Sequence, residues 1–388
     1  MDMKKATIVT AFLNYDYRTR IVYLEKFLVS KGFDVEIITS NYDHRNKREY
    51  FSSRNNVTIL NVPFYKKNFS LRRILSHLSF SRSVRKYLER SESDFVYVIT
   101  PPNFLFKYMG KYKIAHKDVK VIFEIEDLWP ESMPISVTIK KLCHVPFIIW
   151  RKLRDNNICK ADGIVYECEL FRNILGKSNY NTVNEVLYLT KDDVWDESYH
   201  RNFAEDGTVN LLYLGSINNL IDVDLIVDTL IYFNKKRKTC LQIIGQGEKS
   251  LELMEKCKQG GVRYINHGSI YNDEDKKKVI SKCDYALNIM KDTVCVGATM
   301  KSLEYLHYGL PIINNIKGDT KKIVIDYKCG INISKVDYEH EIDKLLSVDD
   351  DEYEKMRNAA RCVYSEFFSP QSYYSKMNDF YLKIIGKE

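Results

Sequence analysis

The sequence contains neither a long apolar run nor a paired-cysteine motif. No stretch of the 388 residues approaches the roughly 20 consecutive apolar residues that a membrane-spanning helix needs. Nine cysteines without a Cys-x-x-Cys pair provide no zinc-binding spacing and indicate free thiols in a reducing cytoplasm. Hydrophobic residues make up 45% and charged residues 29% of the chain, a normal globular balance. We therefore expect a cytoplasmic protein of two ordinary domains.

Several catalytic motifs are also missing. The chain has no Gly-x-Ser-x-Gly, no Walker A and no His-Glu-x-x-His sequence, which removes the α/β-hydrolase, P-loop NTPase and zincin interpretations. The apolar run at 6–13 is short, lacks a small-residue cleavage site and is followed by polar residues 14–17. It predicts a first buried strand rather than a signal peptide.

Positive charge is concentrated in two stretches of the first half. Residues 66–90 carry eight Lys and Arg against Glu89 alone, and residues 139–154 carry five without an acid. Both stretches also contain apolar or aromatic side chains, such as Leu71 and Trp150. Basic amphipathic segments of this kind favour the surface of an anionic membrane, and the alternative is a solvated helix face. No nucleic-acid module is recognisable, so nucleic acid is not an expected partner.

Short apolar segments rich in Val, Ile and Tyr alternate with helical patterns along the whole chain, which predicts parallel sheets with helices on both faces. The strands expected in the first half are residues 6–12, 35–39, 57–62, 95–100, 119–125, 163–167 and 186–189. Those expected in the second half are residues 210–214, 239–244, 262–266, 285–289, 311–314 and 331–333.

We predict an α/β fold with two Rossmann-like domains. Residues 1–190 form the first domain, the polar and acidic segment 191–209 is a linker, and residues 210–366 form the second domain. Ligands in such folds lie at the carboxyl ends of parallel strands, so two of these domains are expected to face each other across a cleft.

The segment 299–313 is the most informative. It reads as a helix that starts at Thr299, carries Lys301, Ser302 and Glu304 in its first turns, and stops at Gly309 before a strand. A helix N-terminus attracts phosphate, and a carboxylate accepts hydrogen bonds from a vicinal diol. The alternative is an ordinary amphipathic helix with a glycine cap.

Other strand ends carry candidate ligand residues. Gly215-Ser216 and Asn218 follow one strand and suit a phosphate turn, and Gly245-x-Gly247 follows the next. The alternative for the first is a plain strand-to-helix turn, and the second is interpreted as a loop beside a base or ribose. Asp222-Val223-Asp224 matches a metal-binding Asp-x-Asp, but it opens a predicted helix, where acids are favoured anyway. Asp127 lies in an acidic stretch after a strand of the first domain, either facing the cleft or merely exposed to solvent.

Taken together, these segments resemble the retaining glycosyltransferases of family 4, which have the GT-B fold, and in particular the members that assemble capsule or O-antigen polysaccharides. The resemblance covers nearly the whole chain. The resemblance rests on these residues: Leu212–Asn219 with 243–248, His267-Gly268-Ser269-Ile270, 301–305 with Gly309-x-Pro311, Thr100-Pro101-Pro102, 127–132 and Phe367-Phe368-Ser369-Pro370. The resemblance implies that residues 367–388 form a C-terminal helix that returns to the first domain.

The resemblance also implies the reaction and its residues. A sugar would pass from a nucleotide diphosphate donor, expected to be UDP-linked, to a lipid-linked glycan acceptor, with retention and without a metal or other cofactor. The implied catalytic residues are Asp127 and Glu304. The implied donor-binding residues are Gly215, Ser216, Asn218, Gly245, Gly247, Lys291, Thr299, Lys301, Ser302 and Glu304.

The chain departs from the family pattern at two places. Gly297 stands where the family has the first Glu of its Glu-x7-Glu pair, and the Arg and Lys that follow the donor glycine are missing. Phosphate charge would then be met by backbone N–H groups and by Lys301 or Lys291. The departures leave open a catalytically degenerate GT-B protein that supports another transferase, and the fold also accommodates a sugar-nucleotide epimerase. The enzyme is expected at the inner face of the plasma membrane.

Overall fold

The computed structural model describes residues 3–13, 20–133, 143–176, 182–193 and 206–386. The chain divides into two compact units. The first consists of Met1–Tyr188 and Tyr373–Glu388, and the second of Leu189–Ser372. Among the described residues, no helix is long and apolar enough to cross a membrane. All nine cysteines are free, as expected.

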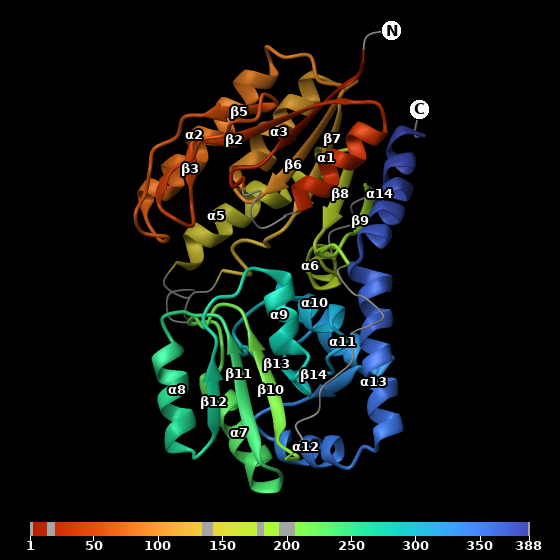
Figure 1. The fold of residues 1–388 in the computed structure, drawn as a ribbon. Helices are drawn as coiled ribbons and strands as arrows, with labels where there is room; N and C mark the ends of the chain where they lie inside the picture. Colours follow the sequence, from red (N-terminus) through yellow and green to blue (C-terminus); the bar gives the residue numbers. More distant parts are fainter. Residues whose placement is uncertain (1–2, 14–19, 134–142, 177–181, 194–205, 387–388) are drawn as a thin grey trace. The chain divides into compact units, whose positions relative to one another are not determined.

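The first unit is built on a seven-stranded parallel sheet with the order β5-β2-β1-β6-β7-β8-β9 (Figure 1). The strands are β1 (Lys5–Val9), β2 (Asp34–Ser40), β5 (Val57–Leu60), β6 (Phe95–Thr100), β7 (Lys120–Ile125), β8 (Gly163–Tyr166) and β9 (Val183–Val186). A small antiparallel hairpin of β3 (Tyr42–Asp43) and β4 (Arg48–Glu49) follows β2; no apolar pattern indicated it. The strand expected at 186–189 lies three residues earlier, because Val183–Val186 pairs with Gly163–Tyr166 at the sheet edge.

Helices cover both faces of this sheet. The helices of the first unit are α1 (Arg20–Ser30), α2 (Leu71–Leu88), α3 (Phe104–Ala115), α5 (His144–Asp155), α6 (Glu169–Leu175) and α14 (Pro370–Ile385), with a 3-10 turn at Ile158–Lys160. α1 and α14 share one apolar core with the sheet, in which Phe27, Met377 and Phe380 are buried against Tyr97. The last helix therefore packs on the first sheet although the rest of the second unit precedes it in sequence. This placement confirms the return predicted from the family resemblance.

The second unit repeats the plan with a six-stranded parallel sheet in the order β12-β11-β10-β13-β14-β15. Its strands are β10 (Val209–Leu214), β11 (Thr239–Ile244), β12 (Arg263–Asn266), β13 (Tyr285–Asn288), β14 (Ile312–Asn314) and β15 (Gly330–Asn332). All six lie within one or two residues of their predicted positions. The apolar alternation of their sequences and the glycine and polar residues that follow them explain this agreement.

The helices of the second unit form two layers (Figure 1). They are α7 (Val223–Lys236), α8 (Ser250–Gln259), α9 (Asp273–Ile280), α10 (Met300–His307), α11 (Asp319–Tyr327), α12 (Tyr338–Leu346) and α13 (Asp350–Val363), and a π-helical turn at Tyr364–Phe368 precedes α14. Side chains of α7, α8 and α12 share one core with the sheet, while α10 and α11 contact β14 and α10 also contacts β13.

Each sheet reverses its strand order next to its first strand. In the first unit the chain leaves β1 for β2 and later returns to pair β6 on the other side, and in the second unit β10 has the same position between β11 and β13. Parallel sheets bind ligands at the carboxyl ends of the strands that flank such a switch point. The carboxyl ends of β10 and β13 in one unit, and of β1 and β6 in the other, are therefore the places to search for sites.

Candidate functional site

The N-terminus of α10 lies at the switch point of the second unit. The Tyr305 hydroxyl accepts a hydrogen bond from the Leu214 N–H at 2.9 Å and donates one to the Leu287 carbonyl at 3.2 Å. It thereby joins the ends of β10 and β13. Tyr305 is fully buried, so this contact fixes the start of α10 against both strands.

Thr299 and Ser302 form a reciprocal cap at the start of α10. The Thr299 hydroxyl accepts from the Ser302 N–H at 3.1 Å, and the Ser302 hydroxyl accepts from the Thr299 N–H at 2.9 Å. The Ser302 hydroxyl also donates to the Thr299 carbonyl at 2.8 Å. Their hydroxyls are thus occupied by the cap, and the two residues hold the helix start. Within the described part of the chain, the N–H groups of Met300 and Lys301 have no acceptor, and they remain for an anion.

The Lys301 side chain places an unpaired charge beside these N–H groups. Its ammonium lies 3.3 Å from the Tyr213 hydroxyl and 4.7 Å from the centre of the Tyr213 ring. Among the described residues, no carboxylate is within ion-pair distance of it. Burial lowers the pKa of Lys301 to about 8, so the group is still protonated at neutral pH. An anion brought to this helix start meets a desolvated cation and two free N–H groups.

The two glycine turns of the second unit interlock. The Gly215 N–H donates to the Ile244 carbonyl at 2.8 Å, and the Ile217 N–H donates to the Gln246 carbonyl at 3.1 Å. A Cβ on Gly245, whose φ is +143°, would lie 2.0 Å from the Gly215 carbonyl oxygen, and one on Gly247 would lie 2.3 Å from that of Ile217. Both positions therefore require glycine. The two turns therefore pack directly against each other, backbone to backbone, at the carboxyl ends of β10 and β11.

The turn that follows Gly215 is held by its own side chains. The Tyr213 hydroxyl donates to the Ser216 carbonyl at 2.9 Å, and the Asn218 side-chain oxygen accepts from the Leu220 N–H at 2.9 Å. Gly215 has φ +113° and open space where a Cβ would lie. The exposed Ser216 hydroxyl and this open face leave room for a ligand beside the turn.

A chain of asparagine side chains connects three strand ends to the α10 cap. The Thr299 hydroxyl donates to the Asn288 oxygen at 3.2 Å, the Asn288 amide donates to Asn314 at 2.9 Å, and the Asn314 amide donates to Asn332 at 2.7 Å. Asn288 and Asn314 are fully buried. This chain was not predicted, although an Asn at or near the end of each of three predicted strands was a visible signal.

Glu304 lies one turn into α10 and is held by two lysines. The Lys276 ammonium is 3.2 Å from one carboxylate oxygen of Glu304 and 3.3 Å from the other, and Lys191 is 3.2 Å from one of them. Asp273 pairs with both lysines, at 2.7 and 3.0 Å. Lys191 was expected in a linker, but it is part of this network. A ligand hydroxyl that binds Glu304 must share the carboxylate with these ammonium groups.

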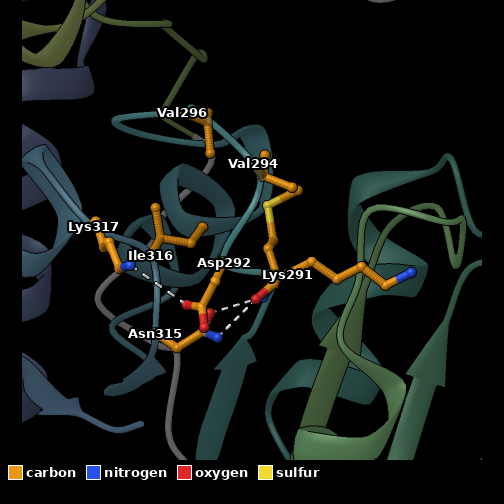
Figure 2. A pocket seen from close by; sticks show the side chains of 8 residues that line it. Lys291, Asp292, Val294, Val296, Asn315, Ile316 and Lys317 are labelled. Carbon is orange, nitrogen blue, oxygen red and sulfur yellow. Dashed lines mark hydrogen bonds and ion pairs between the residues drawn. The ribbon is translucent and has the colours of Figure 1, made fainter. Parts of the chain in front are cut away.

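Lys291 borders a small hollow between the loops that follow β13 and β14. Met290, Val294, Val296, Asn315 and Ile316 line it, and Lys317 pairs with Asp292 at 3.7 Å across it. Figure 2 shows the Lys291 side chain extending away from the other labelled side chains. The enclosed space has room for about one water molecule, far less than the roughly 300 Å³ of a small ligand pocket. Lys291 is exposed, so Lys301 is the better-placed cation for a phosphate.

Asp222 and Asp224 are used by α7 and by nearby lysines. Asp222 caps the helix by accepting from the Leu225 N–H at 3.2 Å, and it pairs with Lys335 at 2.8 Å. Asp224 pairs with Lys256. No group of three His, Cys, Asp or Glu side chains with metal-binding geometry occurs among the described residues. The helix cap and the ion pairs with lysines explain why acids occupy positions 222 and 224, without a bound metal.

In the first unit, Asp127 follows β7 and differs from the acids around it. Glu124 is buried and pairs with Arg20, and Glu131 pairs with Arg154 and Arg151. The Asp127 side chain is exposed and has no ion pair among the described residues. The protein around its carboxyl group nevertheless raises the pKa of Asp127 to about 6, against the opposing charge of Arg73. The Ser132 hydroxyl donates to the Asp127 carboxylate at 3.5 Å, and the rest of this exposed carboxylate can contact a ligand.

The first unit also carries a cluster of rings and cations that the sequence analysis did not single out. Trp129 stacks on His77 with ring centres 5.9 Å apart, and Arg73 lies over the Trp129 ring at 4.6 Å. Tyr65 bonds to His44 at 2.6 Å. The donor-site candidates at 215–218, 245–247 and 299–304 come together at one edge of the second unit, whereas Asp127 belongs to the first unit.

Comparison with known proteins agrees with the fold. No curated protein sequence matches the chain. Solved structures that resemble it include the lipopolysaccharide outer core galactosyltransferase WaaB in its apo form, with TM-score 0.67 and 16% identity over 100% of both chains. HepE of Anabaena, in complex with UDP and glucose, has TM-score 0.64 and 11% identity over 97% of this chain and 99% of that one.

TarM of S. aureus, as a mutant in complex with Fondaparinux, alpha-GlcNAc-glycerol and UDP, has TM-score 0.65 and 12% identity over 98% of this chain and 100% of that one. Residues 208–351 match the family model described as Glycosyl transferases group 1. The chain thus has the GT-B fold, and its residues 208–351 are similar to the Glycosyl transferases group 1 family.

Proposed function

We propose that the protein is a retaining glycosyltransferase that moves a sugar from a nucleotide diphosphate, UDP in the first instance, to a lipid-linked glycan acceptor in bacterial surface polysaccharide synthesis. The observation that carries the proposal is the start of α10. Two free N–H groups and the unpaired Lys301 ammonium lie there at the switch point of a parallel sheet. This combination suits a diphosphate. The match to Glycosyl transferases group 1 and the UDP named with HepE and TarM support the same donor class.

The proposed division of roles follows from the contacts. Lys301 and the turn at Gly215 and Ser216 bind the diphosphate, and Glu304, held in place by Lys276, binds the ribose hydroxyls. Asp127 acts near the reacting sugar. Catalysis then rests on positioning and on stabilising the leaving diphosphate. We propose that no metal takes part, because Asp222 and Asp224 are engaged by α7 and by lysines.

Titration with UDP and UDP-sugars tests the proposal, because a ligand that binds the folded state raises its melting temperature. We expect stabilisation by UDP-sugars and slow hydrolysis of the correct donor in the presence of EDTA. UDP binding without hydrolysis or transfer would favour the degenerate GT-B partner instead. Loss of turnover with EDTA and its rescue by Mn²⁺ would contradict the metal-independent mechanism.

We further propose that the first unit binds an anionic membrane surface. The residues that support this are exposed and lie on or just before α2: Lys66, Lys67, Phe69, Leu71, Arg72 and Leu75. Leu71 is 80% and Leu75 56% exposed. On α5, Val145 and Ile149 are also exposed. Apolar side chains next to Lys and Arg are favourable at the headgroup layer of an anionic bilayer.

The structure corrects which charges can take part. Arg73 is half-buried between rings, Arg82 donates to the Tyr108 hydroxyl, and Arg85 pairs with Glu89. Arg154 is only 2% exposed and pairs with Glu131 and Asp155, so it belongs to the interior. Lys140 and Lys141 lie outside the described residues. The test is therefore co-sedimentation of a Leu71→Asp/Arg72→Glu/Leu75→Asp variant, which leaves Arg73, Arg82 and Arg85 unchanged.

Wild-type protein should sediment with phosphatidylglycerol vesicles at low salt and less so at high salt, because salt screens the attraction. The triple variant should stay in the supernatant while keeping UDP binding. A matched variant on the same unit, Lys117→Glu, should sediment like the wild type. Equal sedimentation with neutral vesicles would contradict the proposal.

A further inference from the structure

Two cations of the first unit are held together without a carboxylate partner. Lys47, in the turn of the β3–β4 hairpin, and Arg73, in the first turn of α2, both lie over the Tyr65 ring, at 5.1 and 5.7 Å from its centre. Both also donate to Asn68: Lys47 to its side-chain oxygen and Arg73 to its carbonyl at 2.8 Å. Neither forms an ion pair within the described residues.

This arrangement is unfavourable for the ligand-free protein. An arginine stays protonated in proteins, and a partly buried charge without a paired counter-ion costs free energy. Asp127 and Asp43 oppose the effect of burial on Arg73 and Lys47, respectively, but neither carboxylate pairs with these cations among the described residues. Burial lowers the pKa of Arg73, and burial together with the Arg73 charge lowers that of Lys47. Lys47 also adopts φ +55°, a left-handed backbone that is unusual for lysine. Cations brought together against their mutual repulsion are compensated when an anion binds between them.

The groups around the two cations favour an anion further. The Nε atom of Arg73 is buried and has no hydrogen-bond partner. His77 is 2% exposed, stacks on Trp129, and has no partner at either ring nitrogen. Burial and the Arg73 charge lower the pKa values of His77 and His44, which leaves both rings neutral at pH 7. A neutral imidazole has one N–H donor, which a phosphate oxygen or sugar hydroxyl can accept.

We propose that Lys47 and Arg73 form an anion subsite in the first unit that binds a phosphate group, with Tyr65 and Trp129 as its aromatic floor. Two cations match the double charge of a phosphate better than the single charge of a carboxylate. The subsite deepens the proposed function and rests on it, because the acceptor is then a phosphate-bearing molecule. Its phosphate belongs either to the glycan carrier or to a membrane lipid headgroup.

Fluorescence of Trp129 provides a local readout, because the Arg73 guanidinium lies 4.6 Å from its ring. The full-length protein is titrated with inorganic pyrophosphate at physiological ionic strength, with saturating UDP present to occupy a donor site. Arg73→Gln is expected to weaken pyrophosphate binding roughly 10- to 100-fold, and Lys47→Gln to weaken it about 10-fold. The matched controls are the exposed arginines in Arg48→Gln and Arg90→Gln, which should stay within about twofold of the wild type.

Additional variants keep the outcome decisive. Arg73→Lys retains the charge and should recover part of the affinity, and thermal unfolding verifies that each variant is folded. Trp129→Phe should abolish the emission change but not the binding measured by calorimetry. Pyrophosphate binding that is equal in Arg73→Gln, Lys47→Gln and both controls, or absent in the wild type, would overturn the subsite.

The source of the phosphate is decided with vesicles. If phosphatidylglycerol vesicles change Trp129 emission in an Arg73-dependent manner and pyrophosphate competes, the headgroup is a natural ligand of the subsite. If pyrophosphate binds and vesicles leave the emission unchanged, the phosphate belongs to the glycan carrier. UDP binding is measured separately in every variant. A wild type that binds pyrophosphate but not UDP would contradict the proposed function and leave the subsite standing.

Discussion

The carboxyl edges of the two sheets have the same topology but opposite surfaces. At the edge of the second unit, glycine turns, an open helix start and small polar side chains expose backbone N–H groups and one unpaired lysine. At the edge of the first unit, rings, neutral imidazoles and cations occupy the corresponding space. We propose that one edge binds a charged, hydrophilic diphosphate and that the other binds a larger ligand with sugar rings and a phosphate. The fold supplies the location, and the residues at the strand ends determine the ligand.

The largest effect is expected where the second edge depends on glycine. In Gly245→Ala the new Cβ would lie 2.0 Å from a backbone oxygen at a position with positive φ. We expect a loss of about 3–5 kcal/mol in the free energy of unfolding, from overpacking and backbone strain together. Gly268→Ala is the control, since its φ is +68° and its Cβ would have no neighbour within 4 Å. It should cost about 1–2 kcal/mol. Equal melting temperatures of the two variants would contradict the interlocked turns.

Replacement of Glu304 by Ala tests the ribose contact at the second edge. We expect UDP binding to weaken by about 1.5–3 kcal/mol, the usual cost of a lost hydrogen bond to a charged group. Because Glu304 also pairs with Lys276 and Lys191, stability should fall as well. Asp273→Asn removes the other acid of the network and serves as the control: it should lower stability but spare UDP binding. Calorimetric titration that finds equal UDP affinity in wild type and Glu304→Ala would disprove the assignment.

Lys301→Met distinguishes a diphosphate ligand held by a side-chain charge from one bound by backbone alone. We expect UDP affinity to fall about 10- to 50-fold, whereas Lys321→Met, an exposed change on α11, should have no effect. With a pKa of about 8, Lys301 must take up a proton to bind diphosphate above that pH. Wild-type UDP affinity should therefore decrease as pH rises through about 8, and the variant should show no such step. A step of equal size in both proteins would assign the titration to another group.

The stability of the ligand-free protein should have the opposite pH dependence. The folded-state pKa of Lys301 is lowered to about 8 from its ordinary value of 10.5, so the unfolded chain binds more protons between these two values. Its contribution to the free energy of unfolding then increases with pH over that window.

Asp127→Asn tests the first edge, where no change in UDP binding is expected. If the Asp127 carboxylate acts on the sugar, turnover at saturating donor should rise about tenfold per pH unit below a pKa of about 6 and then level off. The Asn variant should lack this rise of turnover on the acidic side of the pH profile, while its UDP binding stays unchanged. Glu126→Gln, at the neighbouring position, is the control and should keep the acidic side of the pH profile. An acidic limb that persists in Asp127→Asn would assign it to a different carboxyl group.

The sequence predicted the strands well because buried parallel strands are short apolar runs that end at glycine or polar residues, as at Leu214-Gly215 and Ile244-Gly245. It also located the helix start at Thr299 from its cap. It did not predict that the Thr299 and Ser302 hydroxyls form the hydrogen bonds of the cap, because both hydroxyls were equally suited to bind a ligand. The partners of Glu304 were out of reach, since Lys191, Asp273 and Lys276 are far from it along the chain. The same holds for Lys47 and Arg73, which only the folded hairpin and α2 bring to one ring.

The asparagine chain at the second edge has a direction. From Thr299, every group donates forward, through Asn288, Asn314 and Asn332 to the Lys321 carbonyl. Because the Ile316 N–H also fixes the orientation of Asn314, the amides cannot rotate one at a time without placing two oxygens face to face. The Thr299 proton is thereby committed inward, and the exterior of the helix start offers a ligand only donors from Met300 and Lys301. The buried row thus fixes the direction of the hydrogen bonds, so the outer face of the helix start presents N–H donors, which favour an anion.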